Sequence, residues 1–254
     1  MIVYDFQTLI DQRLLAKEEL SIAIGVFDGV HLGHQDILNK LNKDDNNAVI
    51  TFNVNPKIKN AKYLTTTDIK LEIFEEFNIK YVIIIDFLSN IANMSGSDFL
   101  SLLCTMCRIK TVIVGEDFKC GNPKDSISAY QMKGLALKLG YDINVNIVKT
   151  MFYSNIKIST TYLKSLIELH CDFITYKYLT GRDYIIELKK GNSIVDNNSI
   201  KFVKKSILQV LPPCGKYQVN LGIVNKTLTI DEEYLIIEDT SKVEIKNIIL
   251  TEEL

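Results

Sequence analysis

Residues 24–35 read Ile-Gly-Val-Phe-Asp-Gly-Val-His-Leu-Gly-His-Gln and decide the fold of the first part of the chain. They overlap an apolar run, Ser21–Val26, that is typical of a buried strand, and they lead into a helical pattern at Ile37, Leu38 and Leu41. Glycines in such a turn let the backbone approach a ligand closely, and the amino end of the helix offers unpaired N–H groups. The stretch therefore predicts a phosphate-binding turn at the start of a βαβ unit.

Short apolar runs alternate with helical patterns as far as about residue 180. Ser95 and Asp98 predict a capping box at the start of one helix, and apolar residues from Phe99 to Met106 follow helical spacing. The predicted strands are Ser21–Val26, Ala48–Phe52, Tyr81–Ile85, Thr111–Val114 and Asp142–Val148. Continuous apolar strands separated by helices predict a Rossmann-like α/β domain with a parallel sheet, which binds ligands at the carboxyl ends of its strands.

The pattern changes after Gly181, where strand-like runs are separated by turn residues. These runs are Tyr184–Leu188, Ser193–Val195, Phe202–Leu211, Tyr217–Val224, Thr227–Ile230 and Tyr234–Glu238. They predict a small all-β, barrel-like domain. We therefore expect two domains, residues 1–180 and residues 181–254.

Composition excludes some partners and favours one compartment. The 254 residues carry 29 basic and 31 acidic side chains, so there is no basic field to attract nucleic acid or a membrane. The amino-terminal sequence lacks the pattern of a signal peptide, and five cysteines, an odd number, favour a reducing compartment. We expect a cytoplasmic protein with small-molecule partners; the sequence leaves its oligomeric state open.

His31 and His34 are two of the three histidines in the chain, and they lie at the predicted start of a helix. Residues three apart can face the same way there, and histidine can donate hydrogen bonds to phosphate or carry a positive charge near neutral pH. The pair is predicted to be catalytic, because fixed donors stabilise charge that develops on phosphates. A purely structural turn and a zinc site completed by Asp28 are the alternatives.

The whole stretch 24–35 resembles the signature of bacterial bifunctional riboflavin kinase/FAD synthetases, in their adenylyltransferase module. That module belongs to the nucleotidyltransferases with a His-x-Gly-His motif, and the resemblance extends over most of the first 180 residues. It implies that His31 and His34 contact the phosphates of ATP. It also implies an ATP-binding turn formed by Gly25, Phe27, Asp28 and Gly33.

Residues 51–56, Thr-Phe-Asn-Val-Asn-Pro, are similar to a family segment that reads Thr-Phe-x-Pro-His-Pro. The resemblance implies that Phe52, Asn55 and Pro56 bind the flavin, although Val54 and Asn55 differ from the family residues. A strand ended by proline explains Pro56 equally well.

Residues 114–121, Val-Gly-Glu-Asp-Phe-Lys-Cys-Gly, resemble the family's Val-Gly-x-Asp-Phe-Arg-Phe-Gly. Asp117 is the candidate for a contact on the flavin side or with a metal, because acidic residues at the carboxyl end of a strand are commonly recruited for ligands. Lys119 and Cys120 replace an arginine and an aromatic residue, and Cys120 is expected to pack in the core. A solvated turn is the alternative.

Residues 157–164 resemble the family's Ile-Ser-Ser-Thr-x-Ile-Arg. Ser159 and Thr160 are expected to start a helix and to bind ATP together with Lys164, which stands where the family has arginine. A lysine cannot reproduce the two-pronged contact of a guanidinium. An ordinary helix cap explains this segment without any ligand.

The resemblance implies an FMN adenylyltransferase, which transfers AMP from ATP to FMN and releases pyrophosphate and FAD, with Mg²⁺ bridging the phosphates. No metal site made by the protein alone is expected. A cytidylyltransferase acting on a polyol phosphate and a non-catalytic protein that binds flavin or nucleotide remain as alternatives. The β domain resembles a truncated riboflavin kinase barrel, but none of the four prolines is followed by the threonine of the kinase motif, so kinase activity is expected to be absent.

Overall fold

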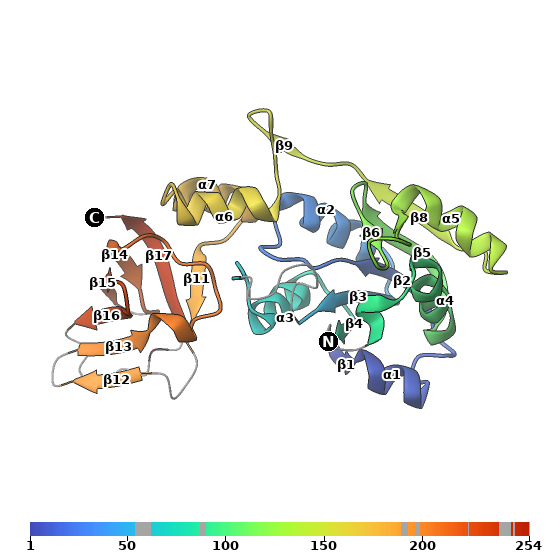
Figure 1. Ribbon diagram of the computed structural model, residues 1–254, viewed down its shortest axis with the longest axis horizontal. Coiled ribbons are helices and arrows are strands. Elements are labelled where there is room, and N and C mark those ends of the chain that lie inside the picture. The colour runs from blue at the N-terminus through green and yellow to red at the C-terminus, as the bar shows by residue number, and fades with distance from the viewer. Residues whose placement is uncertain are drawn as a thin grey trace. The chain divides into compact units, whose positions relative to one another are not determined.

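The structure is a computed structural model that describes residues 1–53, 62–86, 90–188, 193–196, 199–222, 224–238, 245 and 247–253 (Figure 1). The chain divides into two compact units, each of which is described by itself. The first unit comprises Met1–Asn60 and Thr67–Lys157, and the second comprises Ala61–Thr66 and Ile158–Leu254.

A parallel sheet forms the centre of the first unit (Figure 1). Its strands are β1 (Ile2–Asp5), β2 (Glu19–Ile24), β3 (Asn47–Phe52), β4 (Tyr81–Ile85), β5 (Arg108–Gly115) and β8 (Asn144–Val148). They lie in the order β1-β4-β3-β2-β5-β8, and every neighbouring pair is parallel. The predicted parallel α/β fold is confirmed, and β1 is a strand that the sequence did not reveal. The order reverses between β2 and β5, which is where such sheets bind ligands.

Helices and short hairpins connect these strands. The helices are α1 (Phe6–Gln12), α2 (Leu32–Leu41), α3 (Thr67–Glu76), the 3-10 helix η1 (Asn90–Asn93), α4 (Gly96–Met106) and α5 (Ala129–Lys138). The hairpins are β6 (Lys119–Cys120) with β7 (Ile127–Ser128), and β9 (Phe152–Tyr153) with β10 (Ile156–Lys157). The cap predicted for α4 is present, since the hydroxyl of Ser95 accepts a hydrogen bond from the amide of Asp98 at 3.0 Å.

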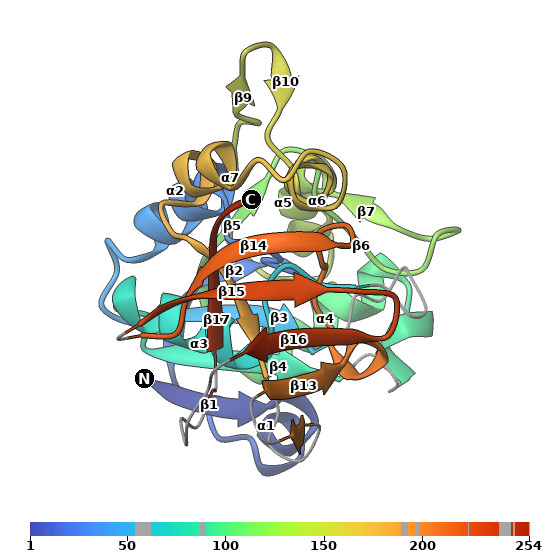
Figure 2. The ribbon, with the colours of Figure 1, turned by 90° about the vertical axis from the view of Figure 1, so that its left-hand side faces the viewer.

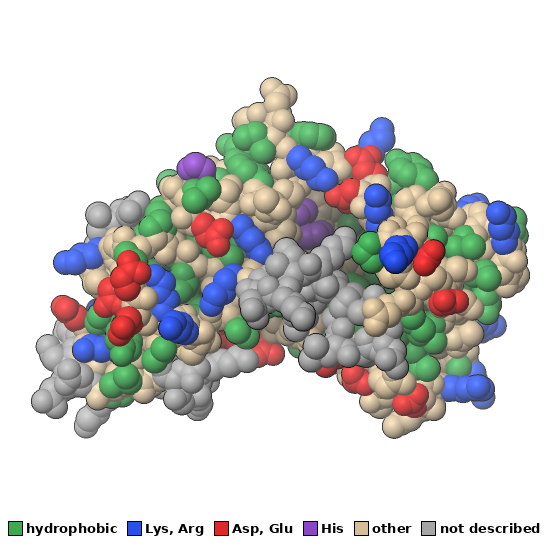
Figure 3. All heavy atoms as spheres, in the orientation of Figure 1, with side chains coloured by type: hydrophobic (Ala, Val, Ile, Leu, Met, Phe, Trp, Pro, Cys, Tyr) green, Lys and Arg blue, Asp and Glu red, His purple; other side chains and the backbone are tan. Residues whose placement is uncertain are grey.

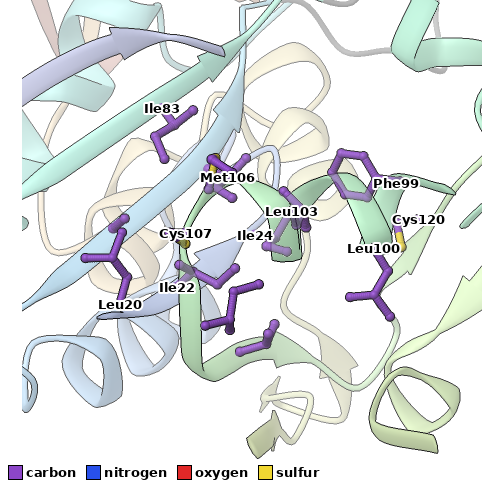
Figure 4. Close-up of a cluster of buried hydrophobic side chains, with 14 of the residues drawn as sticks. Leu20, Ile22, Ile24, Ile83, Phe99, Leu100, Leu103, Met106, Cys107 and Cys120 are labelled. Atoms are coloured by element: carbon purple, nitrogen blue, oxygen red, sulfur yellow. The ribbon is translucent and has the colours of Figure 1, made fainter. Parts of the chain in front are cut away.

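One face of the sheet packs against α4 and its neighbours (Figure 4). Alternate residues of β2, Leu20, Ile22 and Ile24, lie on this face because successive side chains of a strand point to opposite sides. They meet Leu103 and Met106 of α4 in a buried cluster. Cys120 belongs to the same cluster, as expected, so its thiol serves in packing. On the other face, α2 packs against β2 and β5.

The second unit is an antiparallel half-barrel with two helices (Figure 2). Its elements are α6 (Thr160–Glu168), α7 (Phe173–Thr180), β11 (Tyr184–Glu187), β12 (Ser193–Asp196), β13 (Ser199–Val203), the 3-10 helix η2 (Lys204–Ser206), β14 (Gly215–Asn220), β15 (Asn225–Ile230), β16 (Tyr234–Glu238) and β17 (Asn247–Glu253). The strands lie in the order β11-β17-β14-β15-β16-β13-β12. The predicted all-β, barrel-like architecture is confirmed, with two corrections. The strand expected over residues 202–211 ends at Val203, and β17 was not predicted.

The division into compact units falls after Lys157, whereas the sequence suggested a domain boundary at residue 180. Helix α7 packs against β11 and β17, which explains the difference. The rings of Tyr176 on α7 and Tyr184 on β11 make an edge contact with their centroids 5.1 Å apart, and both side chains are fully buried. Helix α7 therefore completes the core of the half-barrel, and α6 packs against α7.

The side chain of Gln209 joins an early segment of the chain to this unit. It is 1% exposed, and its amide nitrogen donates to the carbonyls of Leu64 at 2.9 Å and Ile185 at 2.6 Å. Its carbonyl oxygen accepts from the amide of Glu187 at 2.6 Å. The backbone of Tyr63 adds two hydrogen bonds to residues 208 and 210. Residues 62–64 thus belong structurally to the second unit.

Charged side chains of both signs are interspersed over the face shown in Figure 3. This mixture agrees with the formal net charge of -2 for the whole chain. Among the described residues, no helix is both long enough and apolar enough to cross a membrane.

Gly121 is the glycine where the first unit tolerates a side chain least. Its φ is +94°, and an added Cβ would lie 2.2 Å from the backbone nitrogen of Gly96, at the start of α4. We expect Gly121→Ala to lower the free energy of unfolding by about 2–4 kcal/mol, because strain and a backbone clash add together.

Gly134 provides the matched control. It lies within α5, is exposed, and an added Cβ would meet nothing within 4 Å. Gly134→Ala should raise the free energy of unfolding by up to about 1 kcal/mol, since alanine favours the helix. Urea unfolding followed by circular dichroism measures both changes. Equal stability of the two variants would contradict the close packing assigned to Gly121.

Candidate active site

The turn between β2 and α2 passes three times through the left-handed region of backbone conformation. Phe27 has a φ of 52°, Gly29 of 82° and Val30 of 34°. Glycine adopts such angles freely, but a bulky aromatic or β-branched residue does so only under strain. Strain of this kind is common where a backbone is shaped for a ligand.

Packing beneath the turn holds it in this shape. Phe27 is fully buried, and its ring makes edge contacts with Phe74 of α3 and with His34, at centroid distances of 5.6 and 5.2 Å. The side chain of Gln35 donates to the carbonyl of Val30 at 2.9 Å. A Cβ at Gly25 would lie 3.2 Å from the ring of Phe27, so a glycine leaves room for that ring.

His31 and His34 form a stacked pair at the amino end of α2. Their ring centroids are 3.8 Å apart and the ring planes differ by 12°. His31 is the N-cap residue of the helix, and its Nδ1 accepts a hydrogen bond from the amide of His34 at 3.4 Å. Because Nδ1 accepts, a neutral His31 ring carries its proton on Nε2, where it can be donated to a ligand. The amides of Leu32 and Gly33 have no partner within the helix and point out of its amino end.

Burial keeps both imidazoles neutral. It lowers the pKa of His31 to about 4, although the carboxylate of Asp117 offsets part of the effect. Burial also lowers the pKa of His34 well below its ordinary value, and the positive charge that a protonated His31 would carry, together with that of Lys70, lowers it further. The sequence suggested a positive charge near neutral pH; without a ligand, the structure instead supports neutral rings that donate hydrogen bonds.

Gly33 makes room for the His31 ring. A Cβ at Gly33 would lie 3.3 Å from both Cε1 and Nδ1 of His31, closer than most real contacts. A larger residue would push the imidazole away from the first turn of α2. The glycine in the His-x-Gly-His motif is thus explained by the neighbouring ring, and its proposed approach to ATP stays a prediction.

Asp117 lies at the carboxyl end of β5 and is electrostatically coupled to His31, which follows β2. Its carboxylate forms an exposed ion pair with Lys157, with an N–O distance of 2.6 Å. The coupling of His31 with Asp117 relates the loops after β2 and β5 at the point where the strand order reverses. The sequence had not suggested Lys157 as part of the site.

A buried lysine on α3 is the other residue that sequence reasoning missed. Lys70 is 4% exposed, and its Nζ donates to the carbonyl of Phe52 at 2.9 Å. Burial lowers its pKa to about 8, while the nearby carboxylate of Asp28, itself 3% exposed, favours the charged form. Lys70 stands three and four residues before the buried Ile73 and Phe74, so its place on the buried face of the helix could have been recognised.

The residues predicted to bind flavin are only partly described. Phe52 is the last residue of β3 and is half-buried. Asn55 and Pro56, like Val54, lie outside the described residues. The assignment of these residues and of Asp117 to a flavin site stays a prediction.

Three residues predicted to bind ATP belong to the second unit. Ser159 is the N-cap of α6, and its hydroxyl accepts from the amide of Tyr162 at 3.2 Å. Thr160 is the first residue of that helix, and the Nζ of Lys164 donates to the carbonyl of Lys62. The capping role is confirmed, and the role in binding ATP stays a prediction.

Among the described residues, no group of three or more His, Cys, Asp or Glu side chains could hold a metal ion. The zinc alternative therefore has no support in the described part of the chain. The thiols of Cys104 and Cys107 lie at the end of α4, and burial raises their pKa values to about 11 and about 12, which makes them poor metal ligands at neutral pH.

The neutral state of His31 predicts how stability depends on pH. The unfolded chain binds a proton near pH 6.5, whereas folded His31 does so only near pH 4, so stability falls as the pH drops below about 6.5. Lowering the pH from 7 to 5 should therefore lower the free energy of unfolding by about 2 kcal/mol through this residue alone. His31→Asn keeps a capping side chain but cannot titrate, so the variant should lose that part of the dependence.

Urea unfolding at several pH values measures the effect. The matched control is His170→Asn, which removes an exposed histidine and should follow the wild type. If His31→Asn and wild type showed the same dependence on pH, the buried neutral ring would be disproved.

The chain is similar in sequence to several known proteins. A bifunctional riboflavin kinase/FMN adenylyltransferase from Buchnera aphidicola is 32% identical over 191 residues, which cover 68% of this chain and 59% of that protein. An FAD synthetase from Listeria monocytogenes is 29% identical over 216 residues, which cover 81% of this chain and 83% of that protein. The chain thus spans a little over half the length of the first relative and most of the second.

Among solved structures, a crystal structure described as a macrolide-efflux protein from Streptococcus pneumoniae superposes with a TM-score of 0.74. The superposition covers 100% of this chain and 90% of the chain in that crystal structure, and at 18% sequence identity it shows the fold alone. The sequence pattern of the FAD synthetase family matches residues 14–162, which include the β2–α2 turn, the two histidines and Asp117. Since this match covers more than half of the 254 residues, the chain belongs to the FAD synthetase family.

Proposed function

We propose that the protein is an FMN adenylyltransferase, which transfers AMP from ATP to the phosphate of FMN. The single observation that carries the proposal is the stacked pair His31 and His34 at the amino end of α2, in a strained turn at the point where the strand order reverses. Helix amino ends bind phosphate through their free amides, and this one adds imidazole donors. Membership in the FAD synthetase family supports ATP and FMN as the substrates.

The reaction forms one phosphorus–oxygen bond and breaks another. An oxygen of the FMN phosphate attacks the α-phosphorus of ATP, and the bond from that phosphorus to the bridging oxygen breaks to release pyrophosphate. Nothing in this exchange requires a covalent bond to the protein, so catalysis comes from positioning and from stabilising charge. In the proposal, Nε2–H of His31 donates to a phosphate oxygen, and Gly25, Phe27, Asp28 and Gly33 shape the turn.

We expect the phosphates to hold the Mg²⁺ ion. Magnesium keeps several waters and is commonly bound by substrate phosphates with few protein ligands. The ion would neutralise phosphate charge, while the protein supplies the hydrogen-bond donors.

One assay tests the proposal against its alternatives. The protein is incubated with Mg²⁺ and either ATP plus FMN or CTP plus a polyol phosphate, and the products are separated by chromatography. Formation of FAD supports the proposal, and a CDP-alcohol would show a cytidylyltransferase. Tight binding of FMN or ATP with neither product would show a non-catalytic binding protein.

The histidine pair should control the rate of AMP transfer. We expect His31→Asn and His34→Asn each to lower kcat for FAD formation on the order of a hundredfold or more, because each removes a fixed donor at a developing charge. His31→Asn retains the helix cap, so its fold should be preserved. Near wild-type kcat in both variants, judged against the control His170→Asn, would show that the site has been misplaced.

The protein should not phosphorylate riboflavin. The β domain resembles a truncated riboflavin kinase barrel in its sequence, but the proline-threonine motif is missing from the chain. We expect riboflavin, ATP and Mg²⁺ to yield neither FMN nor FAD, whereas FMN in place of riboflavin should yield FAD. Production of FMN by protein free of contaminating kinase would contradict this expectation.

A further inference from the structure

Lys70 is a buried cation at the ends of two neighbouring strands. Its Nζ lies 2.9 Å from the carbonyl oxygen of Phe52, and 3.4 Å from both the hydroxyl of Thr51 and the carbonyl of Val26. Three acceptors therefore surround an ammonium group that has three N–H donors. A buried lysine is costly unless its hydrogen bonds are satisfied, so this arrangement calls for an explanation.

The three acceptors connect β3 to the start of the turn. Thr51 and Phe52 end β3, while Val26 follows β2 and precedes Phe27, the first left-handed residue. The hydroxyl of Thr51 also donates to the carbonyl of Val26, at 3.1 Å. Lys70 thus bridges the ends of two adjacent strands at the place where the backbone bends toward the histidines.

The charge of Lys70 also acts on the turn. The carboxylate of Asp28 favours the charged form of Lys70, and the ammonium in turn lowers the pKa of His34. Lys70 is therefore coupled to the turn by hydrogen bonds on one side and by charge on the other.

We propose that Lys70 is a positioning residue for nucleotidyl transfer: by bridging the ends of β2 and β3 it fixes the turn 27–31 and, with it, the rings of His31 and His34. This inference rests on the proposed function of the site. Lys70 acts through the two histidines, because its described donors point to protein oxygens. Misplacing reacting groups by about 1 Å can cost a hundredfold in rate, so a bridge of this kind matters for catalysis.

Two measurements, made on the wild-type protein and on three variants, test the proposal. Lys70→Met keeps the side-chain length but removes the ammonium, Lys70→Arg restores a cation, and Thr51→Val removes only the shared hydroxyl. Steady-state kinetics gives kcat and KM for ATP. Long-range ¹H–¹⁵N NMR spectra of the imidazole rings report their tautomer and surroundings, and the chain has only three histidines to assign.

We expect Lys70→Met to lower kcat on the order of a hundredfold with little change in KM, because an interaction that matters in the transition state is lost. The ring signals of His31 and His34 should shift while that of His170 does not, and Lys70→Arg should recover part of both effects. Simple loss of folded protein would reduce the rate but could not move these signals. A folded Lys70→Met protein with unchanged kcat and unchanged ring signals would overturn the proposal.

Two further outcomes are also decisive. If Lys70→Met does not fold, Thr51→Val is measured in its place. Shifted ring signals of His31 and His34 would then support the positioning role, and unshifted signals would overturn it. If wild-type protein forms no FAD, the proposed function fails, and the ring signals in the Lys70 variants still decide whether Lys70 positions the histidines.

Discussion

The edge contact between the rings of Phe27 and Phe74 is the interaction on which the histidine site depends. Phe27 must adopt a left-handed backbone conformation, and Val30 must do the same three residues later. Each such conformation costs about 1–3 kcal/mol, and complete burial contributes about 1.5–3 kcal/mol for each of the two side chains, both of which are 0% exposed. The apolar core beneath the turn therefore offsets the strain above it. The shape of the turn between β2 and α2 is set by packing, and its hydrogen bonds refine a geometry that the core has already imposed.

Burial also determines the charge state of the side chains around this turn. Two neutral imidazoles, a lysine and the carboxylate of Asp28 share a region from which water is largely excluded. Electrostatic interactions are strong there, so a ligand with several negative charges would raise the pKa values of both histidines. Without a ligand, burial keeps both imidazoles neutral. Under the proposed function, binding of phosphates would therefore be coupled to proton uptake by the histidines.

The sequence revealed most of the first unit because its strands are short, apolar and bounded by clear turns. Tyr81–Ile85 was predicted with the bounds of β4, and β2 and β3 were misplaced by at most two residues at either end. Strand β1 was missed because its residues stay mostly exposed and its place in the sheet depends on pairing with β4, far away in the sequence. Strand β17 likewise depends on distant partners, since it pairs with β11 and β14.

The histidine pair was visible because a turn motif is local, whereas the contacts of Lys70 and Lys157 are made by residues distant in the chain. The N-cap role of His31 also escaped prediction, since histidine is not among the residues that favour this position. Spacing alone correctly indicated that the two rings lie on the same side of the helix. It could not reveal that burial keeps them neutral, because desolvation is a property of the folded core.

The segment containing Leu64 separates two parts of the first unit in sequence, yet it belongs to the second. The chain therefore passes between the units more than once, and neither can be obtained intact by a single cut. A fragment beginning at Ile158 would leave the buried amide of Gln209 without the carbonyl of Leu64, at a cost of about 1–3 kcal/mol for the unpaired group. Recombination that exchanged the half-barrel between relatives would carry the same penalty unless this short segment moved with it. Because of this shared segment, we expect relatives to inherit the two units together, even where the chemical roles of the units differ.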